Sequence, residues 1–211
     1  MVSRVIYRPF DEDDFNAIAA ILQAAWHTDA PTPGYAFLEA CADLAHSLSI
    51  STFSQVALID GEPRGISLAR GTNLSVPISS RWKRAEDDFL EQMRLDEPEA
   101  TERYLEMLRL MSEIDTAMLK ESKLPEANEI TLLAVDENAR GLGIGSVLLD
   151  AAASYLSSRG AARAFLYTDT DCGWQFYESQ GFTRAASHHV HREQRSLLPR
   201  EMYVYTLDLT E

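Results

Sequence analysis

The stretch that decides the fold is EITLLAV at residues 129–135, followed by DENARGLGIGS at residues 136–146. The first part is an apolar run of strand length, and the second is a polar turn rich in glycine. Without a Cβ, the glycines of this turn let backbone N–H groups approach a ligand closely. The amphipathic helix predicted after the turn adds unpaired N–H groups and the positive end of its dipole. The sequence therefore predicts an anion-binding turn, to which Arg140 can add a charged contact with phosphate oxygens.

The segments around this turn predict a mixed α/β protein. The helix after the turn ends at a C-cap signal at Gly160, and a buried strand follows at residues 162–168. A strand, a crossover helix and a second strand of this length form a parallel βαβ unit. Further strands are predicted at residues 2–8, 55–59, 65–69, 182–191 and 202–209, with a hairpin turn over residues 60–64. The expected fold class is therefore α/β (α+β), with a mixed central sheet of about seven strands flanked by helices.

Two helices are predicted in the first quarter of the chain. Asp11 has the position of an N-cap, and the helix that follows carries Phe15, Ile18, Leu22 and Trp26 on one side. We expect Trp26 to belong to the core, with a role in lining a substrate site as the alternative. Apolar residues from Tyr35 to Leu48 recur at helical spacing and predict the second helix.

Residues 80–126 predict a helical insertion between the third and fourth strands. Apolar side chains such as Met111 and Ile114 recur at spacings of three and four, and Pro98 separates two helices. The apolar faces are expected to cover the core or a partner subunit in a homodimer, and a lid over the substrate is the alternative. We expect one domain over residues 1–211.

Composition excludes several classes of protein. The chain has 211 residues, 45% of them hydrophobic, and a net charge of -14 without a basic stretch. This balance argues against binding of nucleic acid or of an anionic membrane surface. An acidic surface favours a cationic substrate, although more often it serves only solubility. Two cysteines, Cys41 and Cys172, predict no disulfide framework, and with no long apolar run they indicate a cytoplasmic protein with reduced thiols. The histidines at 188, 189 and 191 have no partner at ligand spacing, so no metal site is expected.

Three kinds of phosphate site are compatible with a glycine turn. A P-loop requires a Lys before its Ser or Thr, and here Ser146 follows Gly145 directly. A dinucleotide fingerprint has a third glycine where this chain has Ser146, and it normally follows the first strand of a parallel sheet. Both matches fail.

The third kind depends on two motifs together. Arg140-x-x-Gly143-x-Gly145 is followed about thirty residues later by WQFYESQGF at residues 174–182. The pair, in this order, resembles the GNAT superfamily of acyl-CoA-dependent N-acetyltransferases. The resemblance covers residues 129–183, and the helical insertion lies outside the usual core of that family.

The resemblance implies roles for particular residues. The backbone of Leu133 and Val135 would bind the pantetheine arm of acetyl-CoA as a neighbouring strand does, and Tyr177 would be the general acid that protonates the departing thiolate. Thr170 and Gly173 stand where many members have Asn and Ala, so they are candidate cofactor contacts that depart from the family pattern. The turn that would bind the pyrophosphate consists of Arg140, Gly141, Leu142, Gly143, Ile144, Gly145 and Ser146.

The chemistry of acetyl transfer requires an acid and a base. A lysine-like amine has a pKa of about 10.4, so a base must remove a proton before it attacks a thioester. Glu129 is the candidate base, acting through water, and the alternative is a solvated carboxylate at the end of a strand. Asp169 and Asp171 are the next candidates, although their spacing suits turn capping equally well. The expected function is transfer of an acetyl group from acetyl-CoA to the primary amine of a small molecule or peptide by direct attack. The alternative is a non-catalytic acyl-CoA-binding sensor or interaction module of the same fold.

Overall fold

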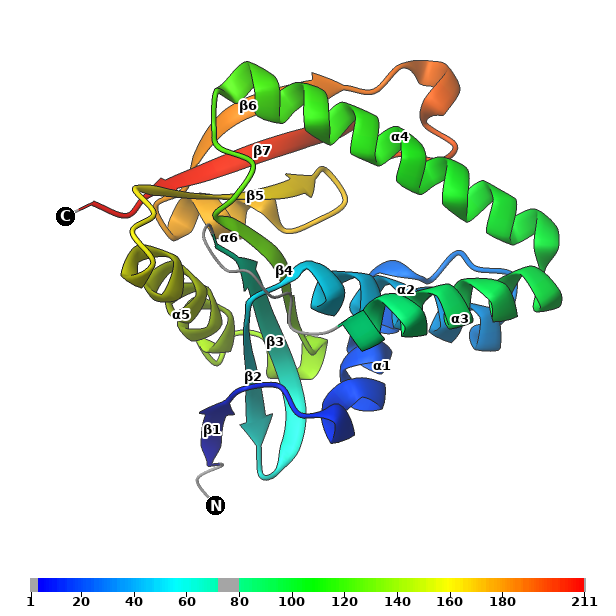
Figure 1. The fold of residues 1–211 in the computed structure, drawn as a ribbon, viewed down its shortest axis with the longest axis horizontal. Helices are drawn as coiled ribbons and strands as arrows, with labels where there is room; N and C mark the ends of the chain where they lie inside the picture. Colours follow the sequence, from blue (N-terminus) through cyan, green and yellow to red (C-terminus); the bar gives the residue numbers. More distant parts are fainter. Residues whose placement is uncertain (1–3, 72–79, 211) are drawn as a thin grey trace.

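The computed structural model describes residues 4–71 and 80–210, and in Figure 1 a twisted sheet carries helices on both faces. In chain order the strands are β1 (Val5–Arg8), β2 (Phe53–Ile59), β3 (Glu62–Arg70), β4 (Glu129–Val135), β5 (Arg163–Asp169), β6 (Thr183–His189) and β7 (Glu201–Asp208). The α-helices are α1 (Phe15–Trp26), α2 (Pro33–Ile50), α3 (Ser80–Asp96), α4 (Pro98–Ser122), α5 (Ile144–Ser158) and α6 (Trp174–Ser179). Short 3-10 helices are η1 (Glu12–Asp14), η2 (Glu137–Ala139) and η3 (Arg192–Gln194).

The seven strands form one mixed sheet in the order β1-β2-β3-β4-β5-β7-β6, which confirms the predicted fold class. Neighbouring strands are antiparallel except for β4 and β5, which are parallel as the βαβ pattern predicts. The register of this pair joins Glu129, the first residue of β4, to Phe165, the third residue of β5. Beyond this pair the two strands diverge (Figure 1). The sheet is therefore open between its β1–β4 half and its β5–β7–β6 half.

A β-bulge accompanies this divergence. In the ladder between β3 and β4, Leu68 pairs with Leu132 and Ala69 pairs with Ile130, so Thr131 is the extra residue. The hydroxyl of Thr131 lies 2.6 Å from that of Ser51, just after α2. Because a bulge bends its strand and increases the local twist, it helps to turn β4 away from β5.

Helices cover both halves of the sheet. α1 and α2 pack on one face of β2, β3 and β4, whereas α5 packs on the other face through residues such as Leu149 and Leu156. α4 covers the β5–β7–β6 half, where Ile114 and Met118 join a cluster with Val204. α3 lies against α1 and α2, and its Trp82 stacks on Phe15 with ring centroids 5.0 Å apart. The apolar faces of residues 80–126 thus cover the core, which is one of the three roles expected for them.

Two details of the sequence reading are wrong. Trp26 is 43% exposed rather than part of the core, because it is the last residue of α1 and projects beyond the packed face. The hairpin turn is shorter than expected, since β3 begins at Glu62 and leaves Asp60 and Gly61 as the connection. Both of these residues have positive φ angles, 53° and 94°, which is the backbone of a two-residue hairpin turn.

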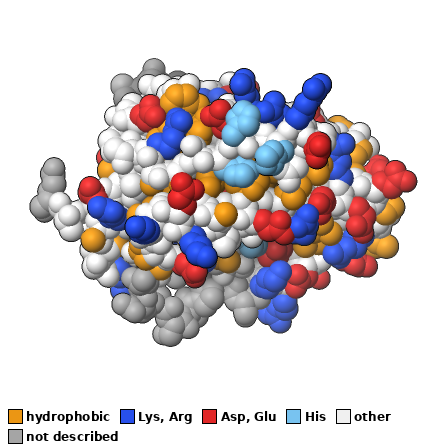
Figure 2. Space-filling model, turned by 90° about the horizontal axis from the view of Figure 1, so that it is seen from above, with side chains coloured by type: hydrophobic (Ala, Val, Ile, Leu, Met, Phe, Trp, Pro, Cys, Tyr) orange, Lys and Arg blue, Asp and Glu red, His pale blue; other side chains and the backbone are white. Residues whose placement is uncertain are grey.

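On the molecular face shown in Figure 2, acidic and basic side chains are interspersed and neither sign gathers into one large patch. Among the described helices, none is both long enough and apolar enough to cross a membrane. The described residues contain no group of three or more His, Cys, Asp or Glu side chains that could hold a metal ion.

Candidate active site

The glycine turn enters α5 through two residues in the left-handed backbone region. Gly141 and Gly143 have φ angles of +79° and +77°, and Gly143 is the N-cap of α5. A non-glycine residue adopts this backbone at a cost of about 1–2 kcal/mol. A Cβ on either glycine would meet no atom within 4 Å, so the turn is open. The N–H groups in the first turn of α5 have no intrahelical partner, and this geometry suits an anion.

Gly145 has a different role, because it has neighbours where a Cβ would be. A Cβ at this position would lie 3.3 Å from Cζ of Phe176 and 3.8 Å from Cγ2 of Val135. The absence of a side chain therefore lets the first turn of α5 approach both α6 and the end of β4. At the entrance to the turn, Asp136 accepts a 2.7 Å hydrogen bond from Arg64 and a 2.9 Å bond from the N–H of Asn138.

A cavity of about 800 Å³ fills the space between β4 and β5. Ten of the thirteen predicted site residues line it: Leu133, Val135, Arg140, Gly141, Gly143, Ile144, Gly145, Ser146, Gly173 and Tyr177. Leu142, Thr170 and Glu129 do not. Leu142 is 63% exposed. Thr170 is engaged with β7, because its N–H donates to the carbonyl of Glu201 (3.0 Å) and its hydroxyl accepts from the N–H of Glu201 (3.3 Å).

One edge of β4 borders this cavity. On the opposite edge, Leu133 pairs with Ser67 and Val135 pairs with Gly65 in β3. On the edge towards β5, Glu129 is the one residue of β4 that pairs with β5 in the described strands. The rest of this strand, residues 130–135, lines the cavity. The backbone groups along this edge are thus placed to pair with an extended ligand as a neighbouring strand would.

Tyr177 lies at the α6 end of the cavity wall. Its ring packs against those of Phe176, Phe182 and Tyr205, with centroids 5.5, 6.0 and 6.4 Å away. Burial raises the pKa of Tyr177 well above its ordinary value, and the nearby Cys172 and Asp169 raise it further. The phenol is therefore protonated at neutral pH and can donate a hydrogen bond or a proton into the cavity.

The glycine turn, the edge of β4 and Tyr177 fall within or beside a segment with a family match. Residues 107–184 match the model described as the acetyltransferase (GNAT) domain. Over these residues the chain matches the GNAT acetyltransferase family.

Curated proteins that are similar to part of the chain are also acetyltransferases. A mycothiol acetyltransferase from Geodermatophilus obscurus is 38% identical over 65 residues, which cover 29% of this chain and 21% of that protein. One from Beutenbergia cavernae is 40% identical over 70 residues, which cover 31% of this chain and 24% of that protein. The chain thus matches less than a quarter of the length of these curated relatives.

Solved structures share the fold over nearly the whole chain. Ard1 from Thermoplasma volcanium superposes with a TM-score of 0.55 and 18% identity, covering 98% of this chain and 99% of that one. The ribosomal-protein-S18-alanine N-acetyltransferase from Escherichia coli gives a TM-score of 0.54 and 12% identity, with 99% and 96% covered. At such identities the likeness concerns the fold alone.

The thiol of Cys172, which lines the cavity, is a poor nucleophile. Burial raises the pKa of its thiol to about 12, with a further contribution from Asp169, whose Oδ2 lies 3.7 Å from the sulfur. A thiol with this pKa is protonated at neutral pH, which disfavours an acyl-enzyme. Asp169 itself caps the turn after β5, since its Oδ1 accepts from the N–H groups of Asp171 (2.7 Å) and Cys172 (3.0 Å).

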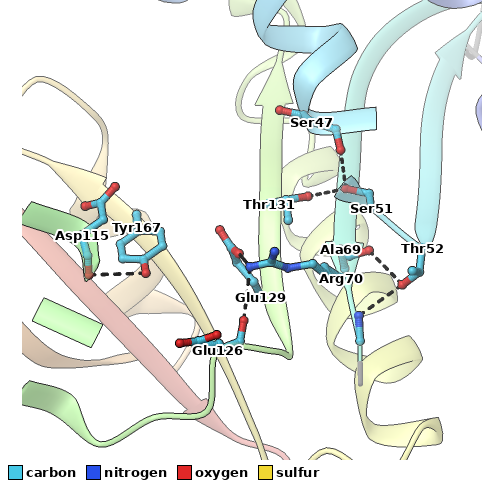
Figure 3. A network of polar contacts seen from close by, with 11 residues as sticks. Ser47, Ser51, Thr52, Ala69, Arg70, Asp115, Glu126, Glu129, Thr131 and Tyr167 are labelled. Atoms are coloured by element: carbon cyan, nitrogen blue, oxygen red, sulfur yellow. Dashed lines mark hydrogen bonds and ion pairs between the residues drawn. The ribbon is translucent and has the colours of Figure 1, made fainter. Parts of the chain in front are cut away.

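Glu129 lies where β4 pairs with β5, at the point from which the two strands diverge. Figure 3 shows its carboxylate against the guanidinium of Arg70, and the two are 2.6 Å apart. Arg70 also donates to the carbonyl of Glu126 at 3.2 Å. Burial raises the pKa of Glu129, while Arg70 opposes this shift. The candidate base is therefore buried beside the cavity and engaged in an ion pair.

Asp115 of α4 also lies near Glu129, and the sequence did not predict it as a site residue. Its Oδ1 is buried and has no hydrogen-bond partner among the described residues. Burial raises the pKa of Asp115 to about 7, and the charges of Glu129 and Asp169 contribute to the shift. The hydroxyl of Tyr167, whose ring lines the cavity, makes a long 3.5 Å hydrogen bond to the backbone carbonyl of Asp115.

A signal for Asp115 was present in the sequence. It lies four residues after Met111 and three before Met118, on the apolar face that predicts the helix. A carboxylate on such a face is rarely buried without a partner, so it indicates a polar site. Trp26 lines the cavity beside Ala25, which agrees with the alternative role given for it from the sequence.

Proposed function

We propose that this GNAT domain is an N-acetyltransferase that transfers an acetyl group from acetyl-CoA to a primary amine by direct attack. The observation that carries the proposal is the cavity between β4 and β5, which extends from the open glycine turn to the phenol of Tyr177. In this proposal one cavity, bordered by the free edge of β4, would join a binding site for a diphosphate to a proton donor.

The residues fit the parts of acetyl-CoA. The N–H groups from Gly141 to Ser146, together with Arg140, would bind the pyrophosphate. The free edge of β4 around Leu133 and Val135 would pair with the amides of the pantetheine arm, because those amides can replace the missing strand. With the cofactor bound in this way, its thioester would lie near Tyr177. Leu142 and Thr170 are not required as side-chain contacts in this arrangement.

Tyr177 would act as general acid. As the amine nitrogen forms its bond to the carbonyl carbon, the carbon–sulfur bond breaks and the electron pair remains on sulfur. Tyr177 donates its proton to that sulfur, so CoA leaves as a thiol. The phenolate regains a proton from solvent. No acyl-enzyme is needed, consistent with the protonated state of Cys172.

Glu129 remains our candidate for the base that takes the amine proton, through water. Its ion pair with Arg70 makes the carboxylate less basic, whereas its burial makes it more basic. Asp115 is the second candidate, because a pKa of about 7 is close to the optimum for proton transfer at neutral pH. Either carboxylate also favours an acceptor that arrives as a cation.

The acceptor is proposed to be a cationic small molecule or peptide amine. Trp26 and Tyr167 give the cavity wall two aromatic side chains that suit such a group. Figure 3 shows Asp115 and Glu129 on either side of Tyr167. The names of similar proteins refer to groups as unlike as mycothiol and the alanine of a ribosomal protein, so they do not choose an acceptor. A cytoplasmic setting is part of the proposal, and the free thiols of Cys41 and Cys172 are consistent with it.

Thiol release from acetyl-CoA tests the proposal, measured across a panel of monoamines, diamines, aminoglycosides, amino acids and peptides. We expect turnover with at least one cationic amine. Tyr177→Phe should lower kcat about tenfold to a hundredfold while acetyl-CoA affinity stays within about twofold. Tyr35→Phe is the matched control, because it also removes one hydroxyl, here bonded to Thr101 outside the cavity wall. Turnover of Tyr177→Phe equal to that of Tyr35→Phe would exclude Tyr177 as the acid.

A second candidate function is an acyl-CoA-binding sensor of the same fold. The observation that favours it is the position of Glu129, which is paired with Arg70 and lies outside the cavity wall. A sensor would be stabilised by CoA and would release no thiol with any amine of the panel. An enzyme would be stabilised by CoA and also turn over.

A further inference from the structure

α6 carries Tyr177 but has little internal support. The helix has six residues, and its N-cap residue, Gly173, has no side chain that could cap it. None of the side chains of the helix is fully buried. Isolated helices of this length are unstable in water. The position of the phenol must therefore depend on contacts between α6 and its neighbours.

Arg184 of β6 makes contacts at both ends of α6. Its guanidinium lies 5.0 Å from the ring centroid of Trp174, the first residue of the helix, and 3.9 Å from that of Tyr203 in β7. It also lies 3.7 Å from the carboxylate of Glu178, next to Tyr177. The register of β6 against β7 shifts between Arg184 and Ala186, and such a bulge can redirect a side chain.

Tyr205 of β7 connects this guanidinium to Glu178. Its hydroxyl accepts hydrogen bonds from Nε (3.0 Å) and Nη2 (2.7 Å) of Arg184 and donates one to Oε1 of Glu178 (2.8 Å). The ring of the same tyrosine packs against the ring of Tyr177, with centroids 6.4 Å apart. One fully buried side chain therefore contacts the proposed acid directly and its helical neighbour through a charge-assisted bond.

We propose that Arg184 and Tyr205 are positioning residues that fix α6, and with it the hydroxyl of Tyr177, relative to the cavity. This inference rests on the proposed role of Tyr177 as general acid. Neither side chain lines the cavity, so both act through Tyr177 and not on the thioester. Loss of their bonds leaves the helix in place on average and loosens the direction of the phenol.

The first test measures α6 itself, in the full chain and without any substrate. Amide hydrogen exchange over residues 174–179 is compared in the wild type, in Tyr205→Phe and in Arg184→Met. We expect exchange about fivefold to tenfold faster in both variants, because a local opening free energy falls when supporting bonds are lost. Arg163→Met is the control: it removes an exposed 2.7 Å ion pair with Asp208, away from α6. Exchange in α6 that matches this control would overturn the inference.

The second test separates positioning from a general loss of stability. Tyr205→Phe is measured alone and combined with Tyr177→Phe, using acetyl-CoA and the amine of the panel that gives the highest turnover. We expect Tyr205→Phe to lower kcat about fivefold with the phenol present and less than twofold without it, since residues that act as a unit are not additive. The Kd for acetyl-CoA should not change.

The outcomes are distinguishable. Equal effects of Tyr205→Phe in both backgrounds would contradict positioning through Tyr177. Wild-type turnover in Tyr177→Phe would remove the proposed acid instead, and the exchange measurement would then decide whether Arg184 and Tyr205 still fix α6.

Discussion

Gly143 and Gly160 stand at the two ends of α5, and alanine at these positions separates anion binding from backbone strain. Both have positive φ angles, +77° and +84°, and a Cβ on either would meet no atom within 4 Å. Alanine should therefore cost about the same at both positions, roughly 1–2 kcal/mol, from the left-handed backbone alone. For a chain of this size, that corresponds to a fall in Tm of about 2–8 °C in each variant.

The two glycines differ in their surroundings. Gly143 lines the cavity and precedes the free N–H groups of α5, whereas Gly160 follows the other end of the helix. Gly143→Ala brings a methyl group and a shifted peptide to the proposed pyrophosphate site. We expect its CoA affinity to fall at least about tenfold, equivalent to about 1.4 kcal/mol, and Gly160→Ala to bind as the wild type does.

Calorimetric titration with CoA measures the affinities, and thermal unfolding without ligand measures the strain. Thermal stabilisation by CoA should be lower only in Gly143→Ala, because ligand stabilisation follows affinity at fixed concentration. Equal CoA affinities in two equally destabilised variants would refute the glycine turn as the anion site.

Two predictions concern buried ionisable groups, and both are checked by urea unfolding as a function of pH. Burial opposes protonation of His27, but the carboxylates of Asp43 and Glu39, 3.0 and 3.1 Å away, outweigh it and raise its pKa to about 9. Protonated His27 contributes at most about 3 kcal/mol to the free energy of unfolding, in full below pH 6.5, and this contribution is lost as the pH rises to 9. A His27→Gln variant whose stability depends on pH as that of the wild type does would contradict this. For Asp115, burial raises the pKa to about 7, so the folded state binds the proton more tightly than the unfolded state does. The free energy of unfolding therefore falls as the pH rises from 3.8 to 7, opposite to the effect of a carboxylate in a stabilising ion pair. Asp115→Asn should therefore be more stable than the wild type at pH 8, by at most about 4 kcal/mol. The control Glu113→Gln, on the exposed side of the same helix, should change the stability little. An Asp115→Asn variant less stable than the wild type would refute the burial of an unpaired charge.

Local patterns in the sequence were sufficient for the elements and for the glycine turn. The helix after Gly143 and the short helix around Tyr177 have signals that depend only on nearby residues. The parallel pairing of β4 with β5 follows from the length of the crossover between them. These features were predictable because the physical cause of each lies within a short segment.

Features that depend on tertiary contacts were not predictable in this way. The engagement of Thr170 with Glu201 and of Glu129 with Arg70 joins strands far apart in the chain. Trp26 has the spacing of a core residue, but its place at the end of α1 exposes it. The burial of Asp115 depends on how α4 packs against the β5–β7–β6 half of the sheet. Helical periodicity identifies a face, and only the fold decides what that face meets.

A crystal structure of the protein grown with CoA tests the central claim most directly. We expect density for the pyrophosphate within hydrogen-bond distance of the N–H groups of residues 141–146. The pantetheine arm should pair with the free edge of β4 near Leu133 and Val135, and its sulfur should lie beside the hydroxyl of Tyr177. CoA bound at any other surface, or a cavity between β4 and β5 that stays empty at saturating CoA, would contradict the proposed site.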